Sequence, residues 1–151
     1  MELRLTLCLP RDELSIPVVR RTMKGALEAL GVPKSQAHDI QVAVSEACTN
    51  VLDHVEEGDE YMMTCTVSED LASIEVVDTG RGFDSESLGH AEADHSAEEG
   101  RGIQLIRALV DKVQFTYQPE RGSIVRFEKR LELPDGSPAK LLALSRGTDG
   151  G

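Results

Sequence analysis

The sequence predicts an α+β fold: a two-layer sandwich in which a mixed, mostly antiparallel sheet is covered on one face by about three helices. Three observations support this prediction. The hydrophobic pattern changes along the chain in the order strand, two helices, two strands, long loop, helix, two strands. No segment repeats, and no linker divides the chain. At 151 residues, 40% of them hydrophobic, the chain has the length and composition of one domain with its own core.

The first third of the chain is expected to form one strand and two helices. Polar residues alternate with leucines over residues 2–9, as in a half-buried strand, and Pro10 ends the pattern. Helical spacing of apolar residues predicts helices over 16–30 and 33–55. The expected core stripes are Val19, Met23, Leu27 and Leu30 in the first helix, and Ile40, Val44, Ala47, Cys48, Val51 and Val55 in the second.

The rest of the chain is expected to contain four strands and one helix. The strands are predicted over 61–67, 71–77, 113–117 and 123–131, and the helix over 100–110. A short turn makes the first two strands a hairpin candidate. Residues 79–99 are rich in Gly, Ser, Asp and Glu, which predicts a long loop. We therefore expect a domain over 1–133 and a disordered tail over 134–151.

Charge and cysteine content limit the classes of partner. The net charge of -11 argues against a general nucleic-acid or anionic-membrane surface, because most of the protein would repel either partner. The three cysteines are scattered and lack metal-ligand spacing, which suits a reducing compartment. The N-terminal apolar run is too short for a signal peptide, and no stretch approaches membrane-spanning length. We expect a soluble, cytoplasmic protein.

Three separate segments carry polar residues that core packing does not explain. In the first, Glu46, Asn50 and His54 are four residues apart and share one stripe of the second helix. Taken alone, this stripe is also what a solvated helix edge looks like.

The second segment begins with Asp78, which directly follows an apolar strand and precedes Gly80 and Gly82, so that a flat ligand could approach the backbone closely. The third leads through Gly100 and Gly102 into a helix, whose free N–H groups suit phosphate oxygens. An ordinary turn and a flexible helix start explain each of these segments almost as well.

The order and spacing of the three segments are more specific than any one of them, and they resemble the GHKL, or Bergerat-fold, ATPases with their histidine-kinase-like ATPase domain. Glu46-x-x-x-Asn50 resembles the N box of that superfamily, Asp78-x-Gly80-x-Gly82 the G1 box, and Gly100-x-Gly102 the G2 box. The chain is most similar to the serine/threonine kinases that act as anti-sigma factors. The stretches that carry this resemblance are SEACTNVLDH, VVDTGRGFD, GRGIQLIRALVDKVQF and GSIVRFEKRL.

The resemblance implies a role for each residue of the N and G1 boxes in binding ATP and Mg²⁺. Asp78 would accept a hydrogen bond from the adenine amino group, which guanine lacks at that place. Gly80 and Gly82 would let the backbone approach the base and the ribose. Asn50 would offer its amide oxygen to Mg²⁺. Glu46 would be the catalytic general base toward an incoming hydroxyl.

It also implies roles for the segments that follow. Gly100, Arg101 and Gly102 would surround the phosphates and stabilise developing charge. Ser123 stands where the family usually has a threonine near the adenine, so the hydroxyl is retained.

The implied function is that of an ATP-dependent protein serine/threonine kinase that binds a sigma factor and phosphorylates an anti-anti-sigma partner of the STAS type. Two alternatives stay open: an ATP-binding partner switch with little or no kinase activity, and the catalytic half of a two-component histidine kinase or a fragment of a larger GHKL ATPase. The family also suggests a homodimer, and it favours Arg20 for a partner-binding face. The leucines at positions 3, 5, 7 and 9 form one face that is either core or a dimer contact.

Overall fold

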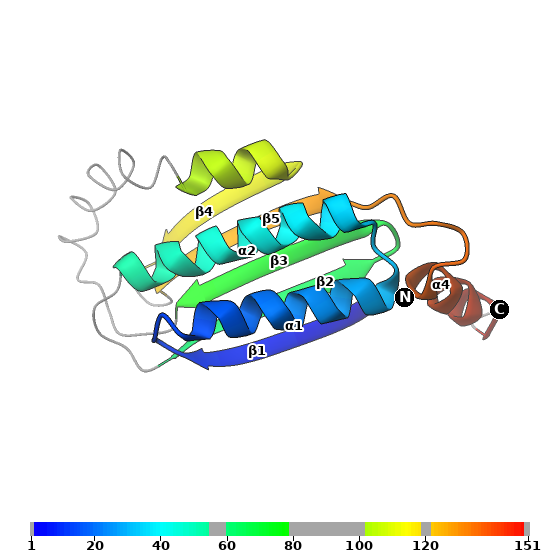
Figure 1. The fold of residues 1–151 in the computed structure, drawn as a ribbon, viewed down its shortest axis with the longest axis horizontal. Helices are drawn as coiled ribbons and strands as arrows, with labels where there is room; N and C mark the ends of the chain where they lie inside the picture. The colour runs from blue at the N-terminus through cyan, green and yellow to red at the C-terminus, as the bar shows by residue number, and fades with distance from the viewer. Residues whose placement is uncertain (1, 55–59, 79–101, 119–121, 150–151) are drawn as a thin grey trace.

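The computed structural model describes residues 2–54, 60–78, 102–118 and 122–149, and these form two layers (Figure 1). The labelled elements are β1 (Glu2–Pro10), α1 (Ser15–Leu30), α2 (Lys34–His54), β2 (Glu60–Ser68), β3 (Leu71–Asp78), β4 (Lys112–Gln118), β5 (Gly122–Arg130) and α4 (Pro138–Asp149). Residues 102–109 form a further helix. The predicted α+β class is confirmed: α1, α2 and the helix over 102–109 lie on one face of a five-stranded sheet (Figure 1).

All four strand pairings in the described sheet are antiparallel, whereas the sequence led us to expect a mixed sheet. The strand order is β1-β2-β3-β5-β4. Two helices connect β1 to β2, and each reverses the chain, so β2 returns antiparallel to β1. Strands β3 and β4 run in the same direction, but β5 lies between them and pairs antiparallel with both. No parallel pair therefore occurs among the described strands.

The core lies between the sheet and the helix layer. The stripe predicted for α1 is buried in full, and that of α2 is buried from Ile40 to Val51; Val55 lies outside the described residues. Strand β2 alternates buried and partly buried side chains, as one covered face requires. The leucines at 3, 5 and 7 pack against this core and Leu9 is buried in it, so the leucine face of β1 belongs to the core.

The C-terminal tail differs from our expectation, because residues 138–149 form α4 instead of being disordered. Ser137 caps this helix, since its Oγ accepts a hydrogen bond of 3.3 Å from the backbone N–H of Lys140. Pro138 follows at the first helical position, where its missing N–H costs nothing. Ser137 and Ala139 are buried, which anchors the start of α4 to the domain.

Gly31 links the end of α1 to this C-terminal segment. Its φ of 82° lies in the left-handed region, and its backbone N–H donates to the carbonyl of Glu28. A Cβ at Gly31 would lie 2.7 Å from the Cβ of Ser137. The close approach of the two segments therefore depends on glycine at this position.

The expected loop over 79–99 lies outside the described residues. None of the helices that the structure describes combines the length and the apolar character needed to cross a bilayer.

Candidate nucleotide site

The elements that carry the predicted site residues meet at one end of the sandwich. Figure 1 shows the end of β3, the C-terminal end of α2 and the start of the helix over 102–109 at this end of the molecule. Strand β3 leads into the glycine-bearing stretch that follows Asp78, and Val51 is the last residue of the α2 stripe that the structure describes.

Glu46 and Asn50 lie one turn apart on α2 at the border of the core. The side chain of Asn50 is buried, with 8% of the residue exposed, and Glu46 is partly buried. A burial of this kind separates the stripe from an ordinary solvated helix edge. The side chain of His54, the next residue along the stripe, lies outside the described part of the chain.

Gly102 brings the predicted phosphate-binding segment to this stripe. It is the first described residue of the helix over 102–109, and a Cβ placed on it would lie 3.6 Å from Oε2 of Glu46. Since the first N–H groups of a helix have no intrahelical partner, Glu46 stands beside a helix end that attracts anions. Two segments more than fifty positions apart in the sequence are therefore neighbours in space.

Asp78 is the last residue of β3 and is completely buried. It pairs with Tyr61 of β2. On the other side Val77 pairs with Ile124, and extending this register by one residue places Ser123 opposite Asp78. Ser123 is also buried, and its Oγ has no hydrogen-bond partner among the described residues. A buried hydroxyl left in this way suits a site that receives a polar ligand.

Arg11, which the sequence analysis did not single out, contacts both Asp78 and α2. Its Nη2 donates a hydrogen bond of 2.9 Å to the carbonyl oxygen of Val51 and lies 3.5 Å from Oδ2 of Asp78. The Arg11 side chain is 6% exposed and that of Asp78 is fully buried, so this is an ion pair inside the protein. Arg11 thus connects Asp78 to the α2 backbone next to Asn50. An isolated arginine after a strand forms no recognisable pattern, so nothing local in the sequence marks it.

Buried polar groups that remain neutral lie next to Asp78, around its strand neighbour Tyr61. Tyr61 shares a hydrogen bond with Ser15, and the Ser15 hydroxyl also donates to the carbonyl of Asp12 at 2.6 Å. Burial raises the pKa of Tyr61 above its ordinary value, and the nearby Cys48 adds to the effect. Burial likewise raises the pKa of Cys48 to about 12, which the hydrogen bond with Tyr61 only partly offsets. Arg11 and Asp78 are therefore the charged pair in this region, beside groups that stay uncharged.

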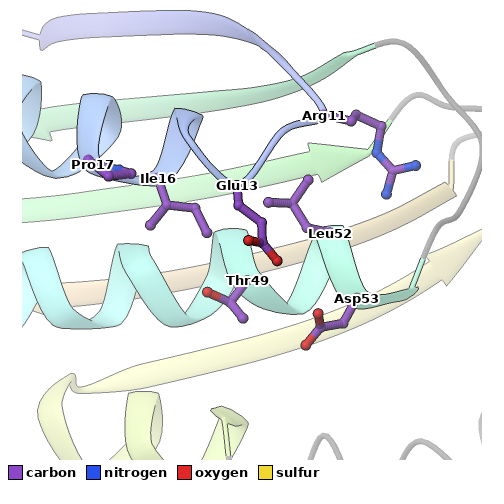
Figure 2. Close-up of a pocket in the computed structure, with 7 residues that line it drawn as sticks. All are labelled: Arg11, Glu13, Ile16, Pro17, Thr49, Leu52 and Asp53. Carbon is purple, nitrogen blue, oxygen red and sulfur yellow. The ribbon is translucent and has the colours of Figure 1, made fainter.

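A cavity of about 620 Å³ opens on the α1 side of this region (Figure 2). Its lining residues are Arg11, Glu13, Ile16, Pro17, Thr49, Leu52 and Asp53. None of the predicted site residues that the structure describes lines it. The cavity is therefore a neighbour of the candidate site and shares Arg11 with it.

The donor set fits a magnesium ion that arrives with a nucleotide better than a metal held by the protein alone. Among the residues the structure describes, no three His, Cys, Asp or Glu side chains cluster as a metal site. Mg²⁺ usually keeps several waters and phosphate oxygens and takes only one or two protein oxygens. The amide oxygen of the buried Asn50 is a suitable ligand of that kind. The predicted residues Gly80, Gly82, Gly100 and Arg101 lie outside the described residues.

Comparison with known proteins places the chain in a family. Residues 9–129 match the model of the histidine kinase-like ATPase domain. The chain is 34% identical over 132 residues to the serine-protein kinase RsbW of Halalkalibacterium halodurans, covering 82% of this chain and 80% of that protein. It is 28% identical over 144 residues to the serine-protein kinase RsbW of Bacillus cereus strain ATCC 10987, covering 86% and 89% respectively.

A solved structure supports the same fold. The crystal structure of the RsbU and RsbW domains of Rv1364c from Mycobacterium tuberculosis matches with a TM-score of 0.68 at 20% identity. The match covers 87% of this chain and only 33% of that longer chain. At this identity the likeness concerns the fold, which agrees with the sandwich described above. The match of residues 9–129 to the family model establishes that the chain belongs to the histidine kinase-like ATPase domain family.

Proposed function

We propose that this protein is an ATP-dependent serine/threonine protein kinase that acts as an anti-sigma factor. The observation that carries the proposal is the meeting of three distant segments at one end of the sheet. Gly102 lies against Glu46, and Arg11 joins Asp78 to the α2 backbone beside Asn50. The relatives named serine-protein kinase support a protein serine as the acceptor.

In the proposed site, Asp78 accepts a hydrogen bond from the adenine amino group, and the Ser123 hydroxyl supplies a second polar contact to the base. Gly80 and Gly82 keep the backbone close to the base and ribose. Asn50 holds Mg²⁺, which neutralises phosphate charge when it is bound. Each of these groups is of the type that its partner requires, and the two strand residues are buried.

Glu46 is the proposed general base. Its carboxylate takes the proton of the incoming hydroxyl while the hydroxyl oxygen bonds to the γ-phosphorus and the bond to the β–γ bridging oxygen breaks, which leaves ADP. Gly100, Arg101 and Gly102 surround the transferring phosphoryl group. The position of Gly102 supports this assignment, since a Cβ built on it would lie 3.6 Å from Oε2 of Glu46, and base and phosphate must lie within reach of one acceptor.

The proposed partners are proteins: a sigma factor and an anti-anti-sigma protein of the STAS type, with the chain itself as a homodimer in the cytoplasm. Phosphorylation of the anti-anti-sigma protein would add negative charge to its surface. This chain carries a net charge of -11, so the modified partner would be repelled and the sigma factor retained. A pull-down from native cells under ATP and under ADP identifies both partners, and sedimentation equilibrium measures the oligomeric state.

Glu46→Gln tests the kinase, with Glu28→Gln on the exposed face of α1 as matched control. We expect E46Q to bind Mg-ATP as wild type does and to lose phosphoryl transfer to the captured partner by about 100-fold or more. E28Q should change neither. Wild-type protein that binds ATP yet yields no phosphoserine or phosphothreonine would favour the alternative, an ATP-binding partner switch with little or no kinase activity. Wild-type protein that binds no Mg-ATP would contradict both.

A further inference from the structure

Arg11 is a buried cation at a turn, where an arginine would normally reach into solvent. It directly follows β1, yet its side chain is only 6% exposed. Arginine is almost never buried without a partner, since removing the charge from water is costly. Here one nitrogen, Nη2, contacts both the Val51 carbonyl and the Asp78 carboxylate. In Figure 2 the guanidinium of Arg11, which also lines the cavity beside Glu13, lies near the end of β3.

The position of this cation matters for what Asp78 can do. A carboxylate that is charged and held in one orientation is a stronger hydrogen-bond acceptor than a neutral carboxyl group, and full burial works against the charged form. A guanidinium 3.5 Å away compensates the charge. The guanidinium also links the carboxylate to α2, because the same nitrogen donates a hydrogen bond of 2.9 Å to the Val51 carbonyl oxygen.

We propose that Arg11 is a positioning residue for nucleotide recognition, which keeps Asp78 charged and oriented toward the adenine amino group and fixes it relative to Asn50 on α2. This inference rests on the proposed function, in which Asp78 is the acceptor for adenine. Arg11 itself does not touch the nucleotide. It acts through Asp78, and it determines how strongly the site prefers a base that carries an amino group at that place.

A purely structural ion pair would produce a different pattern of effects. Loss of a structural contact lowers the binding affinity for all nucleotides by a similar factor, since the whole end of the sheet loosens. Loss of the positioning role weakens only the hydrogen bond between Asp78 and the amino group. ATP and purine riboside triphosphate, which lacks that amino group, therefore report on the role of Arg11 separately from the general integrity of the site.

The test uses the whole 151-residue chain, with calorimetric titration of both nucleotides in the presence of Mg²⁺. Wild-type protein should bind ATP about tenfold or more tightly than purine riboside triphosphate. Arg11→Met should bring the two affinities to within about twofold of each other, mainly by lowering the affinity for ATP. Arg11→Lys keeps the positive charge and should restore most of the difference. Arg21→Met, which removes an exposed arginine of α1, should behave as wild type.

Thermal unfolding shows whether each variant is folded. If R11M fails to fold, Arg11→Gln and R11K provide the comparison, since glutamine removes the charge but keeps a donor. A folded R11M or R11Q protein with the wild-type preference for ATP would overturn the role of Arg11 while leaving the kinase proposal intact. Wild-type protein that binds both nucleotides equally would show instead that Asp78 does not recognise the amino group, and the inference would fail with that assignment.

Discussion

Replacing Gly31 by alanine should destabilise the protein strongly, although the change adds a single methyl group. Gly31 ends α1 with a φ of 82°, a conformation that alanine adopts only at a cost of about 1–2 kcal/mol. The added Cβ would also lie 2.7 Å from the Cβ of Ser137 and 3.0 Å from Cδ of Pro138. Such overpacking costs about 1–3 kcal/mol, because the start of α4 must move.

Together these effects predict a loss of about 2–5 kcal/mol in the free energy of unfolding. For a domain of this size, each kcal/mol lowers the melting temperature by about 2–4 °C. Urea denaturation followed by circular dichroism measures the free energy, and a thermal melt gives an independent check. Gly31→Asn separates the two contributions, because asparagine tolerates a positive φ but still carries a Cβ.

Gly25→Ala is the matched control, with an effect of opposite sign. Gly25 lies inside α1, and a Cβ placed there would meet nothing within 4 Å. Alanine should therefore raise the free energy of unfolding by about 0.5–1 kcal/mol through helix propensity alone. If the free energy of unfolding of G31A lies within about 0.5 kcal/mol of the wild-type value, then neither the left-handed cap nor the contact between α1 and the start of α4 is present as described.

Three further predictions concern the buried groups below the site. Tyr61→Phe should lower the free energy of unfolding by about 0.5–1.5 kcal/mol, because Ser15 keeps its bond to a backbone carbonyl; a loss above 3 kcal/mol in urea denaturation would contradict this account. Native protein at pH 8 should react with a thiol reagent at the exposed Cys8 only, since burial raises the pKa of Cys48 and Cys65 to about 12; rapid titration of all three thiols before unfolding would refute it. Because both folded-state pKa values lie above the ordinary 9.0, the contribution of these two thiols to stability should be constant below pH 9 and be lost as the pH rises toward 12, and a denaturation series from about pH 8 to 12 measures the slope.

Most of the secondary structure was predictable because the local pattern carries it. The periods of the two helix stripes and the alternation in the strands follow from which faces are covered, and the observed elements agree within one or two residues with those predicted up to residue 131. The tail shows the limit of this approach. Ser137 and Pro138 are a recognisable helix start, but whether a short helix persists depends on burial, here against the end of α1 at Gly31.

The candidate site was predictable in part, for a related reason. Glu46, Asn50 and Asp78 stand out because a polar residue on a core border or at a strand end needs an explanation beyond packing. Arg11 does not stand out, because its importance comes from the 3.5 Å approach to a carboxylate 67 positions away. Long-range electrostatic partners leave no periodic trace in a sequence.

The chain alone was enough to establish the α+β class, the core faces of α1 and α2 and the residue types suited to a nucleotide, since all of these arise from local spacing and side-chain chemistry. Only the tertiary structure could place Gly102 against Glu46, pair Arg11 with Asp78 and anchor α4 at Gly31. Those contacts join residues far apart in sequence. They exist because strand order and helix packing bring one end of each element together, and no local preference encodes that meeting.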